Sequence, residues 1–138
     1  MRRFVNPGNT AFEVAVNSQI YVDKTGLLAY TNSVINTKQA LICSSRPRRF
    51  GKSITADMLC AYYSRGCDSD SIFASYEIAK SDSYKKHLNQ YDVIYLDIQW
   101  CMMDAGSAEQ TVSYLNYHVI EELKEIYPQI LLDGIRTA

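Results

Sequence analysis

Residues 46–53 have side-chain types and a spacing that suit the binding of a phosphate chain. They read Arg-Pro-Arg-Arg-Phe-Gly-Lys-Ser, which matches the loop pattern G-x-x-x-x-G-K-[ST] at every defined position except the first. A triphosphate carries closely spaced negative oxygens, which are best met by several backbone N–H groups and the positive end of a helix dipole. The segment therefore predicts a nucleotide-binding loop, whose candidate binding residues are Arg48, Arg49, Phe50, Gly51, Lys52, Ser53 and Ile54.

Three residues of this loop have separate expected roles. Gly51 lets the backbone approach the phosphates because it has no side chain. Lys52 is the first catalytic candidate, since its mobile ammonium group can reach the β- and γ-phosphates. The Ser53 hydroxyl is the candidate metal ligand, because Mg²⁺ prefers oxygen donors. ATP with Mg²⁺ is the expected cofactor pair.

Arg46 stands where the pattern has its first glycine. A residue with a Cβ tolerates positive φ poorly, so either the loop begins in an ordinary conformation or Arg46 is strained. Pro47 fixes its own φ and biases Arg46 toward an extended conformation. Arg48 and Arg49 have three alternative environments: phosphate, an acidic neighbouring domain, or solvent. The loop is expected to differ in shape from the common version.

Apolar runs and helical spacing predict the elements that position this loop. Residues 40–43 form a short apolar run that predicts a buried strand directly before the loop. Residues 54–62 repeat apolar side chains at helical spacing and predict a helix directly after it. Residues 93–98 predict a second buried strand, because they are β-branched and aromatic up to Asp97. The order around the loop is thus strand, loop, helix.

Two further helices are expected on either side of these elements. Apolar residues recur at helical spacing in residues 27–35, with Asp23 placed to cap the free N–H groups of that helix. Ser107 and Gln110 form a capping-box pattern before a long helix that ends near Pro128. Its apolar stripe consists of Val112, Leu115, Val119, Leu123 and Ile126.

Composition excludes several classes of protein. The 138 residues are 47% hydrophobic and 21% charged with a net charge of −1, which is a globular composition and not that of a disordered or generally basic chain. No apolar run approaches the roughly 18 residues of a membrane helix, and the first residues lack the apolar core of a secretory signal. A soluble, cytoplasmic protein without a membrane partner is expected.

The cysteines and histidines do not suggest a metal centre. Four dispersed cysteines lack the paired spacing of a zinc site, and we interpret them as reduced thiols, two of them in the core. His87 lies in a short polar stretch and is expected to be exposed, whereas His118 is expected to be packed or partly exposed beside the apolar stripe.

Three stretches resemble the bacterial AAA-ATPase-like family. They are Tyr-Val-Asp-Lys-Thr at residues 21–25, Ser-Arg-Pro-Arg-Arg-Phe-Gly-Lys-Ser at residues 45–53, and Tyr-Asp-Val-Ile-Tyr-Leu-Asp at residues 91–97. The resemblance implies that Arg46 is a family trait. It also implies longer full-length members, with an amino-terminal P-loop ATPase domain and a carboxy-terminal region that resembles PD-(D/E)xK nucleases.

The fold expected from this resemblance is an α/β, P-loop NTPase-type, three-layer fold with a parallel sheet. Residues 1–138 would form the amino-terminal part of the P-loop domain, so the fold would be incomplete. The chain contains no candidate nuclease core, so nuclease activity is not expected of it.

Asp97 is the second catalytic candidate. A hydrolysing P-loop enzyme needs an acid at the end of a strand to hold Mg²⁺ and an acid to activate water, and Asp97 follows four apolar residues. ATPases of this type usually carry a second acid directly afterwards, whereas Ile98 follows here. The resemblance places the Asp-Glu strand farther along, so Asp97 either belongs to the metal site or closes the second predicted strand.

The main functional expectation is Mg-ATP binding through the modified loop. Hydrolysis is expected of the longer parent and not of this chain alone. One alternative is a nucleic-acid-associated module in which Arg46, Arg48 and Arg49 contact backbone phosphates, and another is an inactive truncated fragment. The nucleotide is the expected partner, with nucleic acid as a further partner of the parent. The sequence leaves the base preference, the coupled process and the oligomeric state open.

Overall fold

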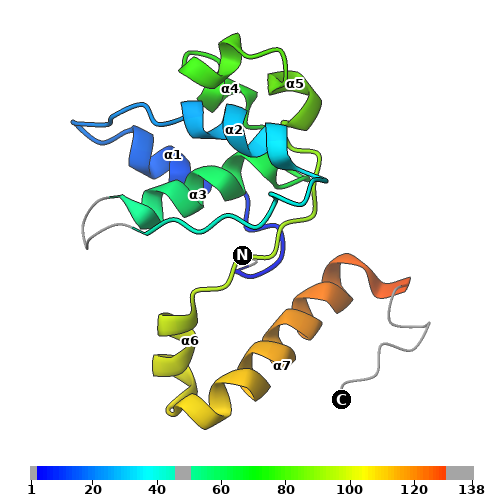
Figure 1. The fold of residues 1–138 in the computed structure, drawn as a ribbon. Helices are drawn as coiled ribbons and strands as arrows, with labels where there is room; N and C mark the ends of the chain where they lie inside the picture. Colours follow the sequence, from blue (N-terminus) through cyan, green and yellow to red (C-terminus); the bar gives the residue numbers. More distant parts are fainter. Residues whose placement is uncertain (1–2, 46–50, 130–138) are drawn as a thin grey trace. The chain divides into compact units, whose positions relative to one another are not determined.

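The computed structural model describes residues 3–45 and 51–129, and Figure 1 shows their helices. The chain divides into two compact units. Residues 8–93 form one of them, and residues 1–7 together with 94–138 form the other. Each unit has an apolar core of its own.

The unit of residues 8–93 is built around the helix that follows the predicted loop. Its elements are α1 (Thr10–Val16), α2 (Gly26–Val34), α3 (Lys52–Tyr63), α4 (Asp70–Phe73), the 3₁₀ helix η1 (Glu77–Lys80) and α5 (Tyr84–His87). α1 packs against α3 (Figure 1), and α2 packs against η1. Phe12, Leu28, Met58 and Tyr62 bring α1, α2 and α3 into one core. The burial of this apolar surface holds α3 against α1 and α2.

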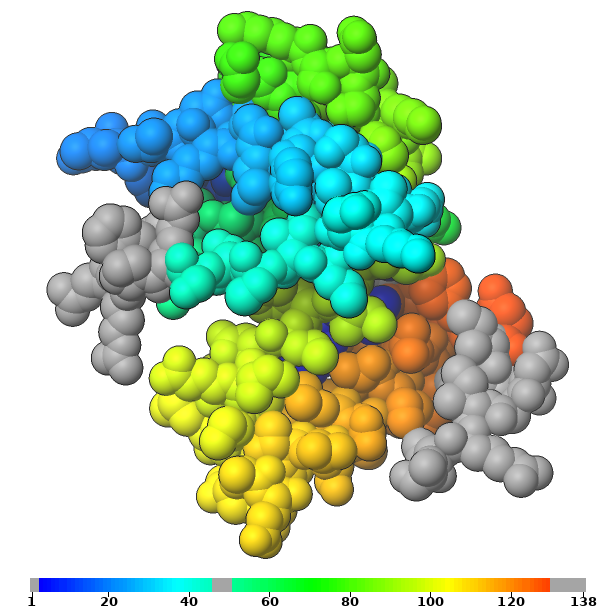
Figure 2. Space-filling view, in the orientation of Figure 1, coloured from blue at the N-terminus to red at the C-terminus, as the bar shows by residue number. Residues whose placement is uncertain are grey.

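The predicted α/β fold with a parallel sheet is wrong, because the described residues contain no strand. β pairing among them is limited to two isolated bridges, Val5 with Ile94 and Ser64 with Tyr91. Residues 40–43 belong to no helix or strand, and Leu41 is 96% exposed. Figure 2 shows this cyan segment at the surface of its unit.

The physical reason for this difference lies in the backbone. A strand needs a neighbouring segment to pair its N–H and C=O groups, and apolar side chains alone do not supply one. Residues 93–98 show the same: after the bridge at Ile94, the chain enters a helix at Ile98. Neither apolar run acquires a ladder within the part of the chain that the structure describes.

The helix predictions are confirmed at α2, α3 and α7 (Ala108–Ile126). The Ser107 hydroxyl accepts the N–H of Gln110 at 3.3 Å, as the capping pattern predicts. Leu115, Val119, Leu123 and Ile126 pack against the core of their unit. Val112 does not belong to this stripe, since it is 66% exposed.

The second unit is a helix pair with the start of the chain packed on it. α6 (Ile98–Ala105) packs against α7, and Phe4, Val5 and Cys101 form the buried core. The Glu122 carboxylate accepts the N–H groups of Arg3, Phe4 and Val5 at 2.7–2.8 Å. One side chain on α7 thus fixes three consecutive residues of the first segment.

Two further findings concern composition. Cys60 and Cys101 are buried, which confirms the prediction of two core thiols. None of the described helices combines the length and the apolar character needed to cross a membrane.

Candidate functional site

The predicted loop leads into α3 through a left-handed turn at Gly51. Gly51 has φ 81° and ψ 22° and is the residue directly before α3. Its carbonyl oxygen accepts both the backbone N–H and the side-chain hydroxyl of Thr55, each at 2.9 Å. Because L-residues adopt this conformation at a cost, the turn itself requires glycine.

Lys52, Ser53 and Ile54 form the exposed first turn of α3. The first N–H groups of a helix have no partner within the helix, and the helix dipole makes this end positive. Among the residues that the structure describes, no side chain caps this end, and the first turn of α3 contains no acidic residue. The arrangement can therefore attract an anion, with the Lys52 ammonium and the Ser53 hydroxyl beside it.

The other predicted site residues are distributed differently. Arg46, Arg48, Arg49 and Phe50 lie outside the described residues. Asp97 belongs to the unit that contains α6 and α7, whereas Gly51 to Ile54 belong to the unit of residues 8–93.

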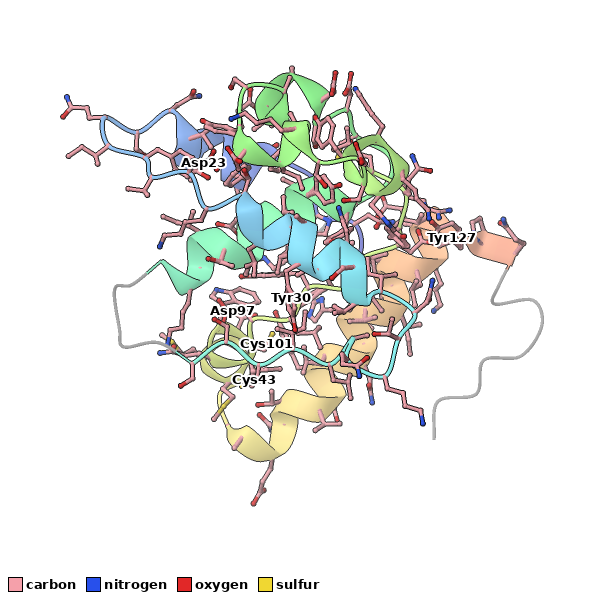
Figure 3. The ribbon with its side chains drawn as sticks, turned by 45° about the horizontal axis from the view of Figure 1, so that its top comes forward. Asp23, Tyr30, Cys43, Asp97, Cys101 and Tyr127 are labelled. Carbon is pink, nitrogen blue, oxygen red and sulfur yellow. The ribbon has the colours of Figure 1, made fainter. Side chains whose placement is uncertain are left out.

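Asp97 has a local structural role at the start of α6 (Figure 3). It is the N-cap residue of this helix, and its Oδ1 accepts the N–H of Trp100 at 2.9 Å. Such a cap stabilises a helix by about 1 kcal/mol. The residue type at this position thus has a structural reason beside the predicted catalytic one.

Residues 23–25 lie in the connection between α1 and α2 and form the second part of the candidate site (Figure 3). Asp23 Oδ1 accepts the N–H of Thr25 at 2.8 Å and its hydroxyl at 2.7 Å. Asp23 Oδ2 accepts the N–H of Glu77 at 2.9 Å, and the Thr25 hydroxyl oxygen accepts the N–H of Ile78 at 3.1 Å. Asp23 and Thr25 thus tie this connection to η1.

The prediction that Asp23 caps α2 is wrong, because its carboxylate bonds elsewhere. Its carboxylate bonds to the N–H of Thr25, just before α2, and to the first residue of η1, but not to the first turn of α2. Partial burial acts to raise the pKa of Asp23, yet the bonds from Thr25 and Glu77 outweigh it and lower the pKa below its ordinary value. Asp23 is therefore ionised at neutral pH.

Lys24, between these two anchors, lies beside Gly51. A Cβ built on Gly51 would be 3.1 Å from Lys24 Nζ, so the ammonium group lies against the backbone at the start of α3. The two residues line one pocket of about 220 Å³. The other lining residues are Ala15, Ser18, Ile20, Tyr21, Val22, Ile54, Thr55 and Met58.

The wall of this pocket is mainly apolar. Ile20 is 87% and Val22 64% exposed, so large aliphatic surface faces solvent at this place. Burial, together with the charge of Asp23, raises the pKa of Tyr21 to about 12. Tyr21 is therefore a neutral phenol at physiological pH.

The pocket lining offers few ligands for a metal. Among the described residues, no group of three His, Cys, Asp or Glu side chains could hold a metal ion. Mg²⁺ bound to a nucleotide keeps several waters and takes oxygens from the phosphates, so it needs few protein ligands. The exposed hydroxyl of Ser53 fits this requirement.

A family model described as Predicted AAA-ATPase matches residues 8–132 of the chain. The chain belongs to this AAA-ATPase-like family. The resemblance in residues 21–25, 45–53 and 91–97 is thereby confirmed, since all three stretches lie within the matched range. This match shows nothing of the predicted nuclease-like region. No curated protein and no solved structure matches the chain.

The loop pattern predicts the site residues on α3 of this AAA-ATPase-like chain but does not include Lys24, which the structure places beside Gly51. Gly51, Lys52 and Ser53 are contiguous, so a pattern along the chain reveals them. Lys24 is part of the Tyr-Val-Asp-Lys-Thr stretch, but its approach to Gly51 joins distant segments. The family stretch is the one signal in the sequence that marks this lysine.

Proposed function

We propose that this chain binds Mg-ATP at the amino end of α3. The observation that carries the proposal is the left-handed turn at Gly51, which places Lys52 and Ser53 in the first turn of a 12-residue helix. This arrangement agrees with the loop pattern in the sequence. Membership of a family of predicted AAA-ATPases supports ATP as the ligand.

In this proposal each residue has a definite task. The backbone N–H groups around Gly51 bind the phosphate oxygens, and Lys52 contacts the β- and γ-phosphates as a point charge. Ser53 holds Mg²⁺ through its hydroxyl oxygen. The bound Mg²⁺ would neutralise charge on the phosphate chain.

Turnover by this chain alone is expected to be negligible. None of the described residues that line the pocket beside Gly51 is acidic, so no general base for water stands there. Asp97 stays a predicted acid of the metal site, and its carboxylate accepts the N–H of Trp100 at the start of α6. We propose ATP hydrolysis only for a protein in which this chain is joined to the missing acidic residues.

The test is isothermal titration of the 138-residue chain with Mg-ATP. Lys52→Ala should weaken binding by at least about tenfold, since a bond to a charged phosphate is worth about 1.5–3 kcal/mol. Lys86→Ala is the matched control, because Lys86 is an exposed lysine of α5 in the same unit. Equal affinity in the Lys52→Ala and Lys86→Ala variants would refute the proposal. Phosphate release that Lys52→Ala abolishes would refute the expectation of negligible turnover.

The same chain can be tested for nucleic-acid binding by Arg46, Arg48 and Arg49. Such binding should weaken steeply as the salt concentration rises, because bound phosphates release counterions. Binding of Mg-ATP should instead depend on Lys52 and discriminate triphosphate from monophosphate. A chain that binds neither ligand would be an inactive fragment.

A further inference from the structure

The pocket beside Gly51 contains a lysine that the loop pattern does not include. We propose that Lys24 binds the phosphate chain of the nucleotide together with Lys52, and that the apolar wall of the same pocket contacts the base. This inference rests on the proposed function, and it adds a binding residue and a base site to it.

The position of Lys24 is the first argument. Its Nζ is 3.1 Å from the place where a Cβ of Gly51 would be. Gly51 directly precedes Lys52 and Ser53, so the ammonium group lies beside the backbone that faces a phosphate in the proposed function. A phosphate bound there would lie within reach of two ammonium groups from separate segments of the chain.

The second argument is that the backbone at Lys24 is already fixed. Asp23 and Thr25 each bond to η1, through Glu77 N–H and Ile78 N–H respectively. Thr25 is 0% exposed, so the anchor is part of the core and not a surface contact. Less backbone freedom is lost when a ligand binds to a fixed segment, and this favours affinity.

The third argument is the charge of the lining. Lys24 is charged and no acidic residue is present among the described residues that line the pocket. The adjacent first turn of α3 adds the exposed Lys52 and the positive end of the helix dipole. A pocket of this character favours a polyanion over a neutral or cationic ligand.

The fourth argument is the size and the apolar wall of the pocket. Pockets that enclose whole drug-sized ligands measure about 300–1,000 Å³, whereas this one measures about 220 Å³. It therefore holds a part of a nucleotide. Ile20, Val22 and Ile54 expose aliphatic surface at this place. A flat base gains by covering such surface, and a phosphate does not.

The two parts of the inference are tested by three variants and two ligands. The ligands are ATP and inorganic tripolyphosphate, and both are measured by competition with a fluorescent ATP analogue on the 138-residue chain. Lys24→Gln should weaken both ligands by about tenfold, because a charged contact to phosphate is lost. Lys24→Arg should retain most of the affinity. Ile20→Ser should weaken ATP by about threefold and leave tripolyphosphate unchanged.

The controls separate this inference from the proposed function. Lys86→Gln removes one positive charge elsewhere in the same unit and should behave like the wild type. If the wild type binds ATP through Lys52 and Lys24→Gln equals Lys86→Gln, the inference alone is refuted. If Lys52→Ala does not affect binding, both fail. Lys24 and Ile20 are exposed, so circular dichroism should show that their variants are folded. If Lys24→Arg loses as much affinity as Lys24→Gln, the role of the charge is also refuted.

Discussion

Replacing Thr25 by valine removes one hydroxyl from the core and keeps the volume of the side chain. This hydroxyl donates to Asp23 Oδ1 at 2.7 Å and accepts the N–H of Ile78 at 3.1 Å. Thr25 is 0% and Ile78 1% exposed, so the N–H of Ile78 would be left without a partner in the core. An unsatisfied buried donor costs about 1–3 kcal/mol. We expect Thr25→Val to lower the free energy of unfolding by about 2 kcal/mol.

Urea denaturation followed by far-ultraviolet circular dichroism at pH 7 measures this change. Thr25→Ser is the matched control, because it keeps both hydrogen bonds and removes a methyl group at a cost of about 1 kcal/mol. Amide exchange at Ile78 gives a local readout, which should be faster in Thr25→Val than in Thr25→Ser. The reasoning is refuted if Thr25→Ser is the less stable variant, or if exchange at Ile78 is equal in the two.

Three further predictions concern pH, the first segment and the loop. Burial, with a smaller contribution from Lys86, lowers the pKa of His87. The free energy of unfolding should therefore fall as the pH drops from about 6.5 toward that lower pKa. Nuclear magnetic resonance titration of the His87 ring checks this, and a pKa above about 6.5 would contradict it. Glu122→Ala should destabilise its unit by about 2–4 kcal/mol, because three N–H groups lose their acceptor. Trp100 fluorescence in urea measures this, and an unchanged unfolding midpoint would exclude this role of Glu122. Gly51→Ala should lower the free energy of unfolding by about 1–2 kcal/mol in thermal unfolding, because the φ of residue 51 is left-handed. It should also weaken ATP binding, because the added Cβ would displace Lys24. A variant with wild-type stability and affinity would argue against both effects.

The sequence predicts those parts of the fold that depend on neighbouring residues. α7 follows from an apolar stripe and a cap, and both are local, since Ser107 and Gln110 are three residues apart. Residues 40–43 show the limit of this reasoning. Their apolar character suits a buried strand, but pairing depends on a second segment, and none of the described residues provides one. Leu41 is consequently exposed to solvent.

His87 illustrates the same limit for a single side chain. Its polar neighbours predict exposure, yet it is only 9% exposed. Its Nδ1 is 2.6 Å from the hydroxyl of Tyr91, and the two rings stack. α5 has a buried side that the sequence does not reveal, since Tyr84 in the same turn belongs to the core. A short helix takes its orientation from such tertiary contacts and not from its own composition.

The candidate site combines a local pattern with a contact that only folding creates. Gly51, Lys52 and Ser53 are recognisable because the loop pattern is contiguous. Lys24 reaches Gly51 because its two neighbours, Asp23 and Thr25, bond to η1 while α1 and α3 share a core.

Stability and binding should therefore separate within these three consecutive residues. Thr25→Val removes an anchor and lowers the free energy of unfolding, because its hydroxyl is buried. Lys24→Gln leaves both anchors in place, so it should reduce ATP affinity and lower the free energy of unfolding less than Thr25→Val does. Asp23→Asn loses the charge that strengthens the bonds to Thr25 and Glu77, so it should lower the free energy of unfolding at pH 7. Because the pKa of Asp23 is below its ordinary value, the wild type should lose this contribution to stability only in acid. Urea denaturation at pH 7 and pH 3 measures the difference in free energy of unfolding between the wild type and Asp23→Asn. If this difference is as large at pH 3 as at pH 7, the charge of Asp23 does not hold this segment.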